Sequence, residues 1–295
     1  MIWVVSLLGV FFLPQAWISD SHQQSAIWAL LGLSNWYFGS GIEAYFEPRA
    51  EYNPFLHTWS LGIEVQFYFL FGCLAIGLLW LVPNKKRALM LLMICIAIIS
   101  IFFSILQYLY LKQDIFYATA YRLWEIGLGV FLRWRSLEKT PLQKPPTNQG
   151  CMPIFAMGLL LFAPTKALSD GLWPHLLACL FTAALLVSLT TRRKNASRLT
   201  QFLNSNPLSV VGNASYAIYV WHWPVIVYMR WTIGIEEKWH FLAAIVLIFF
   251  ISIITYRYYE NPLRASKILR SKPVTVLIIF CSLILFSWWG IQKLY

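Results

Sequence analysis

The sequence predicts an all-α, polytopic integral membrane protein with about eight to ten transmembrane helices. Hydrophobic residues make up 59% of the 295 residues, charged residues only 12%, and the mean hydropathy is +0.62. A soluble domain carries about a quarter charged residues, so there is too little polar sequence here to cover a water-exposed surface. Apolar runs recur along the chain, and basic residues gather between pairs of these runs. Together these observations exclude a soluble or a disordered protein.

Eight apolar runs from Trp59 onward approach the roughly 20 residues that a helix needs to cross a bilayer. They cover about residues 59–82, 88–111, 115–132, 152–168, 172–190, 208–231, 239–258 and 273–290. Their apolar residues lie on all sides rather than on one stripe, as expected for helices surrounded by lipid and by other helices. Polar residues inside the runs are costly in lipid and therefore mark candidate functional positions.

The N-terminal part allows two interpretations. Residues 1–18 are long enough to span with the N-terminus inside, whereas residues 26–38 are short for a span. We favour one span followed by an interfacial or re-entrant helix. Two crossings would require Met1 to start outside. A signal peptide is rejected because the segment has no positive n-region and no small-residue cleavage site.

The basic residues indicate the orientation of the chain. Lys and Arg number 23 against 12 acidic residues, a net charge of +11. Four basic clusters lie within residues 85–87, 133–144, 192–198 and 257–272, and two expected spans separate each cluster from the next. All four can therefore lie on one side, which the positive-inside rule makes cytoplasmic. The excess charge is thus typical of cytoplasmic loops rather than of a nucleic-acid partner.

The domain organisation is expected to be simple. The longest polar stretch, about residues 133–149, contains Pro145 and Pro146 and is predicted to be a cytoplasmic loop. It is too short for a soluble domain, so residues 1–295 are expected to form a single membrane domain. The five cysteines show neither a disulfide framework nor zinc spacing, and no metal site is expected.

The first segment with candidate chemistry lies at the outer end of the first long apolar run. Ser60 and Glu64 are four residues apart and share a helix face, and His57 precedes Glu64 by two turns. A histidine and a carboxylate on one face can act as a general base and its orienting partner. The alternative is a helix cap with Glu64 near the positive dipole end. Capping alone does not explain why Glu64 and Gln66 lie one turn into an apolar run.

The second segment carries Arg122 and Glu125, three residues apart in an apolar run. The two side chains can neutralise each other as a structural pair. Equally, the forked guanidinium of Arg122 can bind an anionic group of a substrate. The sequence leaves both interpretations open.

The third segment places Asn213, Ser215 and His222 in an otherwise apolar run. His222 lies mid-run between Trp221 and Trp223, so it is either a packing histidine or a functional one.

The fourth segment brings Glu260 and Arg264 together, four residues apart at the cytoplasmic end of a span. An ion-paired helix end followed by Pro262 is the structural interpretation. The functional alternative is an anchor near an anionic cytosolic donor.

In this order, the four segments resemble the acyltransferase 3 family of bacterial inner-membrane enzymes, which O-acylate surface sugars. The family's elements read His-Thr-Trp-Ser-Leu with Glu and Gln-Phe-Tyr, Arg-x-Trp-Glu-x-Gly, Ser-Tyr-x-x-Tyr-x-Trp-His-x-Pro and Tyr-Arg-x-x-Glu-x-Pro-x-Arg. They are matched by His57–Leu61 with Glu64 and Gln66–Tyr68, by Arg122–Gly127, by Ser215–Pro224 and by Tyr256–Arg264.

The resemblance implies a membrane O-acyltransferase in the bacterial inner membrane. It would transfer an acyl group, usually acetyl from cytosolic acetyl-CoA, to a hydroxyl of lipopolysaccharide, O-antigen, another surface polysaccharide or a lipid-linked sugar. Acyl-CoA would be a donor substrate rather than a bound cofactor, and the other partners would be the lipid bilayer and the glycan. The expected catalytic residues are His57, Glu64 and His222, with His57 favoured as the base because it lies on the acceptor side. The expected substrate-binding residues are Ser60, Gln66, Arg122, Glu125, Asn213, Ser215, Glu260 and Arg264.

One departure from the family concerns the N-terminus. Family members begin with two further helices that carry an Arg and a His, and this chain starts beyond them. The chain is therefore expected to be N-terminally incomplete. The alternatives are an inactive fragment from a disrupted gene, a misplaced start codon, and half of a split protein whose missing helices come from a separate chain. If those helices supply the base, His57 and His222 become supporting residues. The alternatives from other functional classes are a transporter or flippase for lipid-linked sugars and a non-catalytic membrane subunit.

Overall fold

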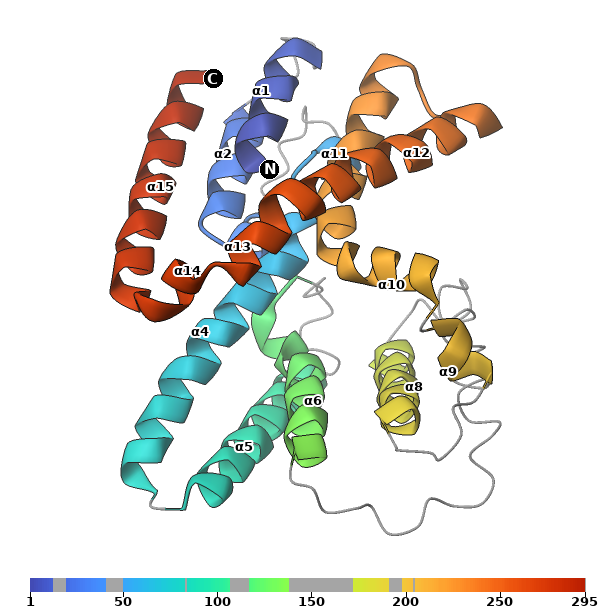
Figure 1. Ribbon diagram of the computed structural model, residues 1–295. Coiled ribbons are helices and arrows are strands. Elements are labelled where there is room, and N and C mark those ends of the chain that lie inside the picture. The colour runs from blue at the N-terminus through green and yellow to red at the C-terminus, as the bar shows by residue number, and fades with distance from the viewer. Residues whose placement is uncertain are drawn as a thin grey trace. The chain divides into compact units, whose positions relative to one another are not determined.

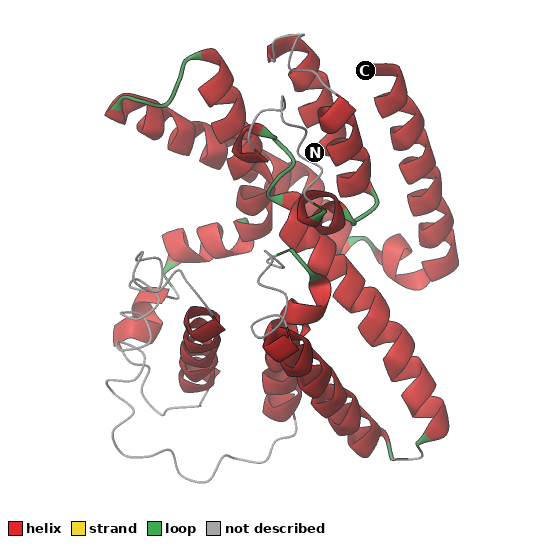
Figure 2. Cartoon of the chain, turned by 180° about the vertical axis from the view of Figure 1, so that it is seen from behind, coloured by secondary structure: helices red, strands yellow, loops and turns green. Residues whose placement is uncertain are grey.

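The computed structural model describes residues 1–12, 20–40, 50–82, 84–106, 117–137, 172–190, 198–203 and 205–294. Every regular element in these ranges is helical (Figures 1 and 2). Three of the described helices are long and apolar enough to cross a membrane, namely Thr58–Leu81, Lys238–Ala265 and Val274–Leu294. The predicted all-α membrane fold is confirmed.

The described chain divides into two compact units. The first comprises Met1–Gln66 with Asn204–Tyr295, and the second comprises Phe67–Leu203. Helix α4 (Thr58–Leu81) therefore begins in the first unit and continues into the second. The single membrane domain over residues 1–295 stays a prediction.

The first unit is built from two groups of helices and the start of α4. Helices α1 (Ile2–Phe12), α2 (Asp20–Leu30) and α15 (Pro273–Leu294) lie side by side (Figure 1). Helices α11 (Ser215–Thr232) and α12 (Lys238–Thr255) form an antiparallel pair. The shorter elements are α3 (Ser34–Gly39), η2 (Ala50–Tyr52), α10 (Asn206–Asn213), η5 (Tyr256–Glu260), α13 (Asn261–Ala265) and α14 (Lys267–Ser271).

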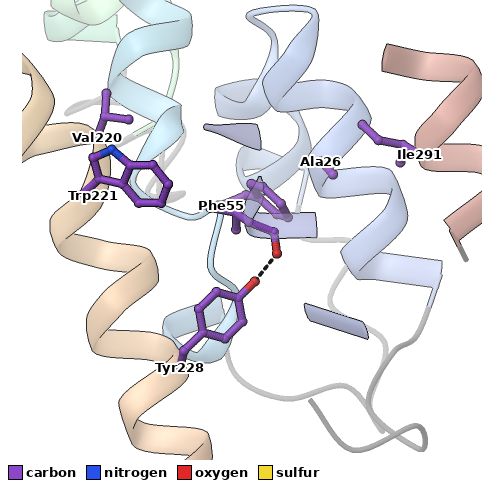
Figure 3. Close-up of a cluster of buried hydrophobic side chains, with 7 residues drawn as sticks. Ala26, Phe55, Val220, Trp221, Tyr228 and Ile291 are labelled. Carbon is purple, nitrogen blue, oxygen red and sulfur yellow. Dashed lines mark hydrogen bonds between the residues drawn. The ribbon is translucent and has the colours of Figure 1, made fainter. Parts of the chain in front are cut away.

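A buried apolar cluster joins the helices of the first unit. Its members come from α1, α2, α11, α15 and the turn before α4, and the hydroxyl of Tyr228 hydrogen-bonds to the Val5 carbonyl at its edge (Figure 3). The cluster consists of Val5, Ala26, Phe55, Val220, Trp221, Tyr228 and Ile291. Truncating any of these close-packed side chains would leave a cavity and cost stability. Because Phe55 packs with the α11 members of the cluster, the cluster holds the turn before α4 against α11.

The N-terminal expectations are changed in detail. The apolar run at residues 26–38 is not one helix, because α2 ends at Leu30 and α3 begins at Ser34. Gly32 between them has φ +70°, the left-handed conformation that terminates helices and that glycine adopts without steric cost. A side chain at Gly32 would also crowd α4, because a Cβ there would lie 3.1 Å from Cγ1 of Val65.

The apolar run at residues 208–231 was predicted to form one continuous span, and this prediction is wrong. The structure breaks this run into α10 and α11 at Ala214, whose φ and ψ of −88° and 3° lie outside the α-helical region. The hydropathy of the run does not reveal such a break, because the break depends on the backbone conformation of one residue and not on the composition of the run. Pro224 lies inside α11, and the helix continues through it.

The second unit contains the rest of α4 with α5 (Lys85–Leu106), α6 (Thr119–Leu137), α8 (Leu172–Thr190) and α9 (Arg198–Leu203). Its core consists of Phe67, Leu92, Met93, Ile96 and Leu123. Helix α6 extends to Leu137, so the predicted loop at 133–149 begins in a helix. Its remainder and the predicted span at 152–168 lie outside the described residues.

Candidate active site

A loop that α11 holds in place carries His57 to the start of α4. The indole Nε1 of Trp223 donates to the Asn53 carbonyl at 2.8 Å, and that of Trp231 donates to the Tyr52 carbonyl at 3.3 Å. The side-chain oxygen of Asn53 accepts the Phe55 backbone N–H at 2.9 Å and thereby closes the turn. Polar groups of one helix therefore position the loop that precedes His57.

His57 and His222 lie together although they are far apart in the sequence. Their ring centroids are 5.6 Å apart with planes at 78°. Nε2 of His57 lies 3.2 Å from the Val220 carbonyl oxygen. Because a carbonyl only accepts, Nε2 carries the proton in the neutral ring, which leaves Nδ1 as the lone-pair nitrogen. Within the described residues this buried Nδ1 has no hydrogen-bond partner.

His222 is arranged in the opposite tautomer. Its Nδ1 lies 2.5 Å from the Tyr219 carbonyl oxygen, so Nδ1 carries the proton and Nε2 carries the lone pair. The ring is half-buried, whereas only 5% of His57 is exposed. His222 therefore offers a more accessible proton-accepting nitrogen than His57 does.

Two hydroxyls bind the backbone carbonyl of His57. Tyr219 donates from its hydroxyl to the His57 carbonyl at 2.6 Å and makes a very short contact with Oγ of Ser60. Ser60 also donates to the His57 carbonyl, at 3.4 Å. Sequence reasoning singled out Ser60 but missed Tyr219, although its position one turn before His222 places both on one helix face.

Burial determines the charge of His57, which lies in the turn ahead of α4. The pKa of His57 is lowered from 6.5 to about 3, chiefly by burial and in smaller part by the neighbouring His222. The carbonyls of Val220 and Pro54 favour the protonated ring but do not offset these effects. His57 is therefore neutral at ordinary pH and a weak base, which makes it less suited to proton abstraction than the sequence alone indicated.

Glu64 and Gln66, the two other candidates on α4, are not placed for direct catalysis. Glu64 is exposed, and within the described ranges neither ring nitrogen of His57 bonds to its carboxylate. The Val220 carbonyl orients the imidazole instead. Gln66 donates to the Gly32 carbonyl at 3.1 Å and to Oδ1 of Asn35 at 2.7 Å, so its amide fastens α4 to the turn between α2 and α3.

The remaining candidates of the first unit lie at helix ends. Asn213 and Ser215 are exposed on either side of the break between α10 and α11. The carboxylate of Glu260 is 2.6 Å from Arg264, with the Glu260 side chain 9% and the Arg264 side chain 62% exposed. This is the ion-paired helix end that the structural interpretation describes.

Arg122 and Glu125 belong to the second unit. The Arg122 guanidinium lies 3.4 Å and 3.5 Å from the two carboxylate oxygens of Glu125, and both side chains are largely buried. The two charges pair with each other, as expected for charges in an apolar helix. Across the described ranges, no three His, Cys, Asp or Glu side chains gather closely enough to hold a metal ion.

Comparison with known proteins gives a consistent result. A family model described as an acyltransferase domain matches residues 1–257, which include His57, Tyr219 and His222. The peptidoglycan O-acetyltransferase OatA of Listeria monocytogenes is 27% identical over 276 residues, and the O-acetyltransferase OatA of Staphylococcus aureus is 27% identical over 282 residues. Each match covers 90% of this chain but 44% of the relative, so the chain spans less than half the length of these proteins.

A third relative is closer to this chain in length. The putative membrane-bound transacylase BcsY of Komagataeibacter xylinus is 28% identical over 279 residues, which cover 90% of this chain and 68% of BcsY. No solved structure matches significantly.

Proposed function

The chain belongs to the acyltransferase family whose model matches residues 1–257, and from this membership we propose that it is a membrane O-acyltransferase acting on a surface glycan. It passes an acyl group, in the first instance acetyl, from acyl-CoA to a sugar hydroxyl. The names of the OatA relatives support O-acetyl transfer, and one of them names peptidoglycan as the polymer. The resemblance of the four segments supports lipopolysaccharide or another surface polysaccharide as further acceptors.

The observation that carries the proposal is the arrangement of His222. Its Nδ1 proton is held by the Tyr219 carbonyl at 2.5 Å, so Nε2 presents a lone pair from a fixed ring. A histidine fixed in one tautomer, with the lone pair on a defined nitrogen, can act as the general base that deprotonates an alcohol.

The reaction follows from this arrangement. The sugar hydroxyl loses its proton to Nε2 of His222 while its oxygen bonds to the acyl carbonyl carbon. The carbon–sulfur bond of the thioester then breaks, and the coenzyme A thiolate leaves and takes up the proton. As His222 becomes an imidazolium, its Nδ1–H bond to the Tyr219 carbonyl strengthens, because a charged donor makes the stronger bond. His57 stays neutral and does not repel this charge.

The test is acyl transfer in native membranes, where any partner chain is retained. We expect labelled acetyl-CoA to acylate a surface glycan, and His222→Gln to lower the rate by about 10²–10⁴-fold. His57→Gln is expected to reduce it less. The matched control is His240→Gln, because His240 is on α12 and contacts neither ring of the pair. Full transfer by His222→Gln would overturn this assignment, and loss of polymer export rather than of acyl groups would favour a transporter.

A further inference from the structure

The last turn of α11 carries Arg230, for which the described part of the chain offers no acidic partner. The guanidinium carbon of Arg230 lies 5.9 Å from the centroid of the Trp223 ring, over its face. Its hydrogen bond is to the Glu51 carbonyl, at 3.5 Å. No carboxylate among the described residues forms a salt bridge with Arg230, which is exposed. Its positive charge is therefore available to a ligand.

The same indole also borders the proposed base. The Trp223 ring centroid is 6.5 Å from that of His222, and its Nε1 is anchored on the Asn53 carbonyl. The guanidinium is therefore no farther from the imidazole than these two ring separations together. One or two sugar rings bridge such a distance.

Two general roles of arginine do not account for this geometry. A cation in the last helical turn favours the dipole, and an arginine near a membrane surface extends its head group toward water. Neither role requires the side chain to cover Trp223 beside His222. Moreover, the four basic clusters lie on the expected cytoplasmic side, whereas Arg230 lies at the end of α11 that meets the His57 loop.

We propose that Trp223 and Arg230 form an acceptor subsite for an anionic sugar, one that bears a carboxylate or a phosphate group. The guanidinium pairs with the anionic group through its forked donors, while the hydroxyl to be acylated lies at Nε2 of His222. The inference rests on the proposed acyl transfer to a glycan, and it adds the chemical class of the acceptor.

The test compares matched acceptors: an oligosaccharide containing a uronic acid, its carboxyl-reduced neutral form, and a phosphorylated form. In the wild type we expect a lower KM for the acidic acceptors. Arg230→Gln is expected to raise that KM by about tenfold or more with little change in kcat, and to leave the neutral acceptor unaffected. Arg230→Lys retains the charge without the fork and is expected to be intermediate. The two acidic acceptors show which anion is preferred.

The matched control is Lys238→Gln, which removes another exposed charge near the same end of the α11–α12 pair. If the overall positive charge at this end of the helix pair attracted the acceptor, both variants would raise the KM for acidic acceptors. That result would refute the subsite. It would also be refuted if Arg230→Gln changed all acceptors equally or none. If the wild type acylates nothing, the proposed function fails, whereas calorimetric binding of the acidic and neutral oligosaccharides still tests the subsite.

Discussion

The hydroxyl of Tyr219 donates a hydrogen bond to the backbone carbonyl of His57 at 2.6 Å. The backbone carbonyl of the same tyrosine holds Nδ1 of His222 at 2.5 Å. One residue therefore contacts both histidines, through its side chain on one and its main chain on the other. The separation of the two imidazoles depends on this residue.

The first prediction concerns Tyr219→Phe, which removes the hydroxyl and keeps the ring and the carbonyl. The turn that carries His57 then loses one of its hydrogen bonds to α11, and we expect kcat to fall about tenfold, the equivalent of roughly 1.4 kcal/mol. KM is expected to change little, because the lost bond is not made to a substrate. Steady-state kinetics on membranes, normalised to folded protein, measures both.

The matched control for this prediction is Tyr228→Phe. Tyr228 lies on the same helix and also donates from its hydroxyl to a backbone carbonyl, that of Val5, but it touches neither histidine. It is expected to lower stability while kcat per folded molecule stays unchanged. Equal losses of kcat in the two variants would show that Tyr219 acts only through general packing.

The second prediction is a loss of stability in acid. Burial lowers the pKa of His57 to about 3 and that of His22 on α2 to about 4, both from 6.5. The unfolded chain therefore binds more protons than the folded chain below pH 6.5. Each histidine is expected to cost about 1.4 kcal/mol of stability per pH unit as the pH falls from there toward its folded-state pKa.

Thermal melts in nanodiscs between pH 7 and pH 4 test this sign. The melting temperature is expected to fall with acidity, and His57→Gln and His22→Gln should each reduce that dependence. Their effects should add, because the two side chains do not pair with each other. A melting temperature that rises on acidification would contradict the buried, neutral state of both rings.

The long helices could be predicted from the sequence because apolarity alone determines them. The run at 59–82 became α4 at Thr58–Leu81, and the run at 172–190 became α8 at Leu172–Thr190. The break at Ala214 could not be predicted, because one residue's dihedral angles leave no trace in hydropathy.

The site was predictable only in part. His57, Ser60 and His222 stood out as polar groups in apolar surroundings. Their proximity depends on the tertiary structure and cannot be deduced from their spacing in the sequence. The Val220 carbonyl that orients His57 leaves no side-chain signal at all. Glu64 was predicted to orient His57 because helical spacing identifies neighbours only within one helix, and the true partner lies on another.

The third prediction tests the contact between α4 and the α2–α3 turn. A Cβ on Gly62 would lie 2.8 Å from Oδ1 of Asn35 and 3.1 Å from the Gly32 carbonyl oxygen. Gly62→Ala must therefore push the turn away and weaken the bonds that Gln66 makes to it. We expect a loss of about 1–3 kcal/mol, measured as a lower melting temperature.

The matched control for Gly62 lies on the same helix. A Cβ on Gly72 would meet no described atom within 4 Å. Gly72→Ala is expected to be neutral or slightly stabilising, because alanine favours helix by up to about 1 kcal/mol over glycine. If both substitutions behaved alike, helix propensity rather than the close approach would dominate at Gly62.

The fourth prediction concerns α15, whose residues lie beyond the range that the family model matches. The Trp3 indole occupies the space that a Cβ on Gly290 would need, and it stacks on Phe286 at 6.1 Å. Gly290→Ala must displace this ring and is expected to cost about 1–3 kcal/mol.

Trp3→Leu alone is also expected to destabilise the protein, through lost packing. In the double variant the smaller side chain makes room for the methyl group, so the combined loss should be smaller than the two single losses together. Melting temperatures of the four proteins measure this coupling, and strictly additive losses would show that Trp3 does not fill the space beside Gly290.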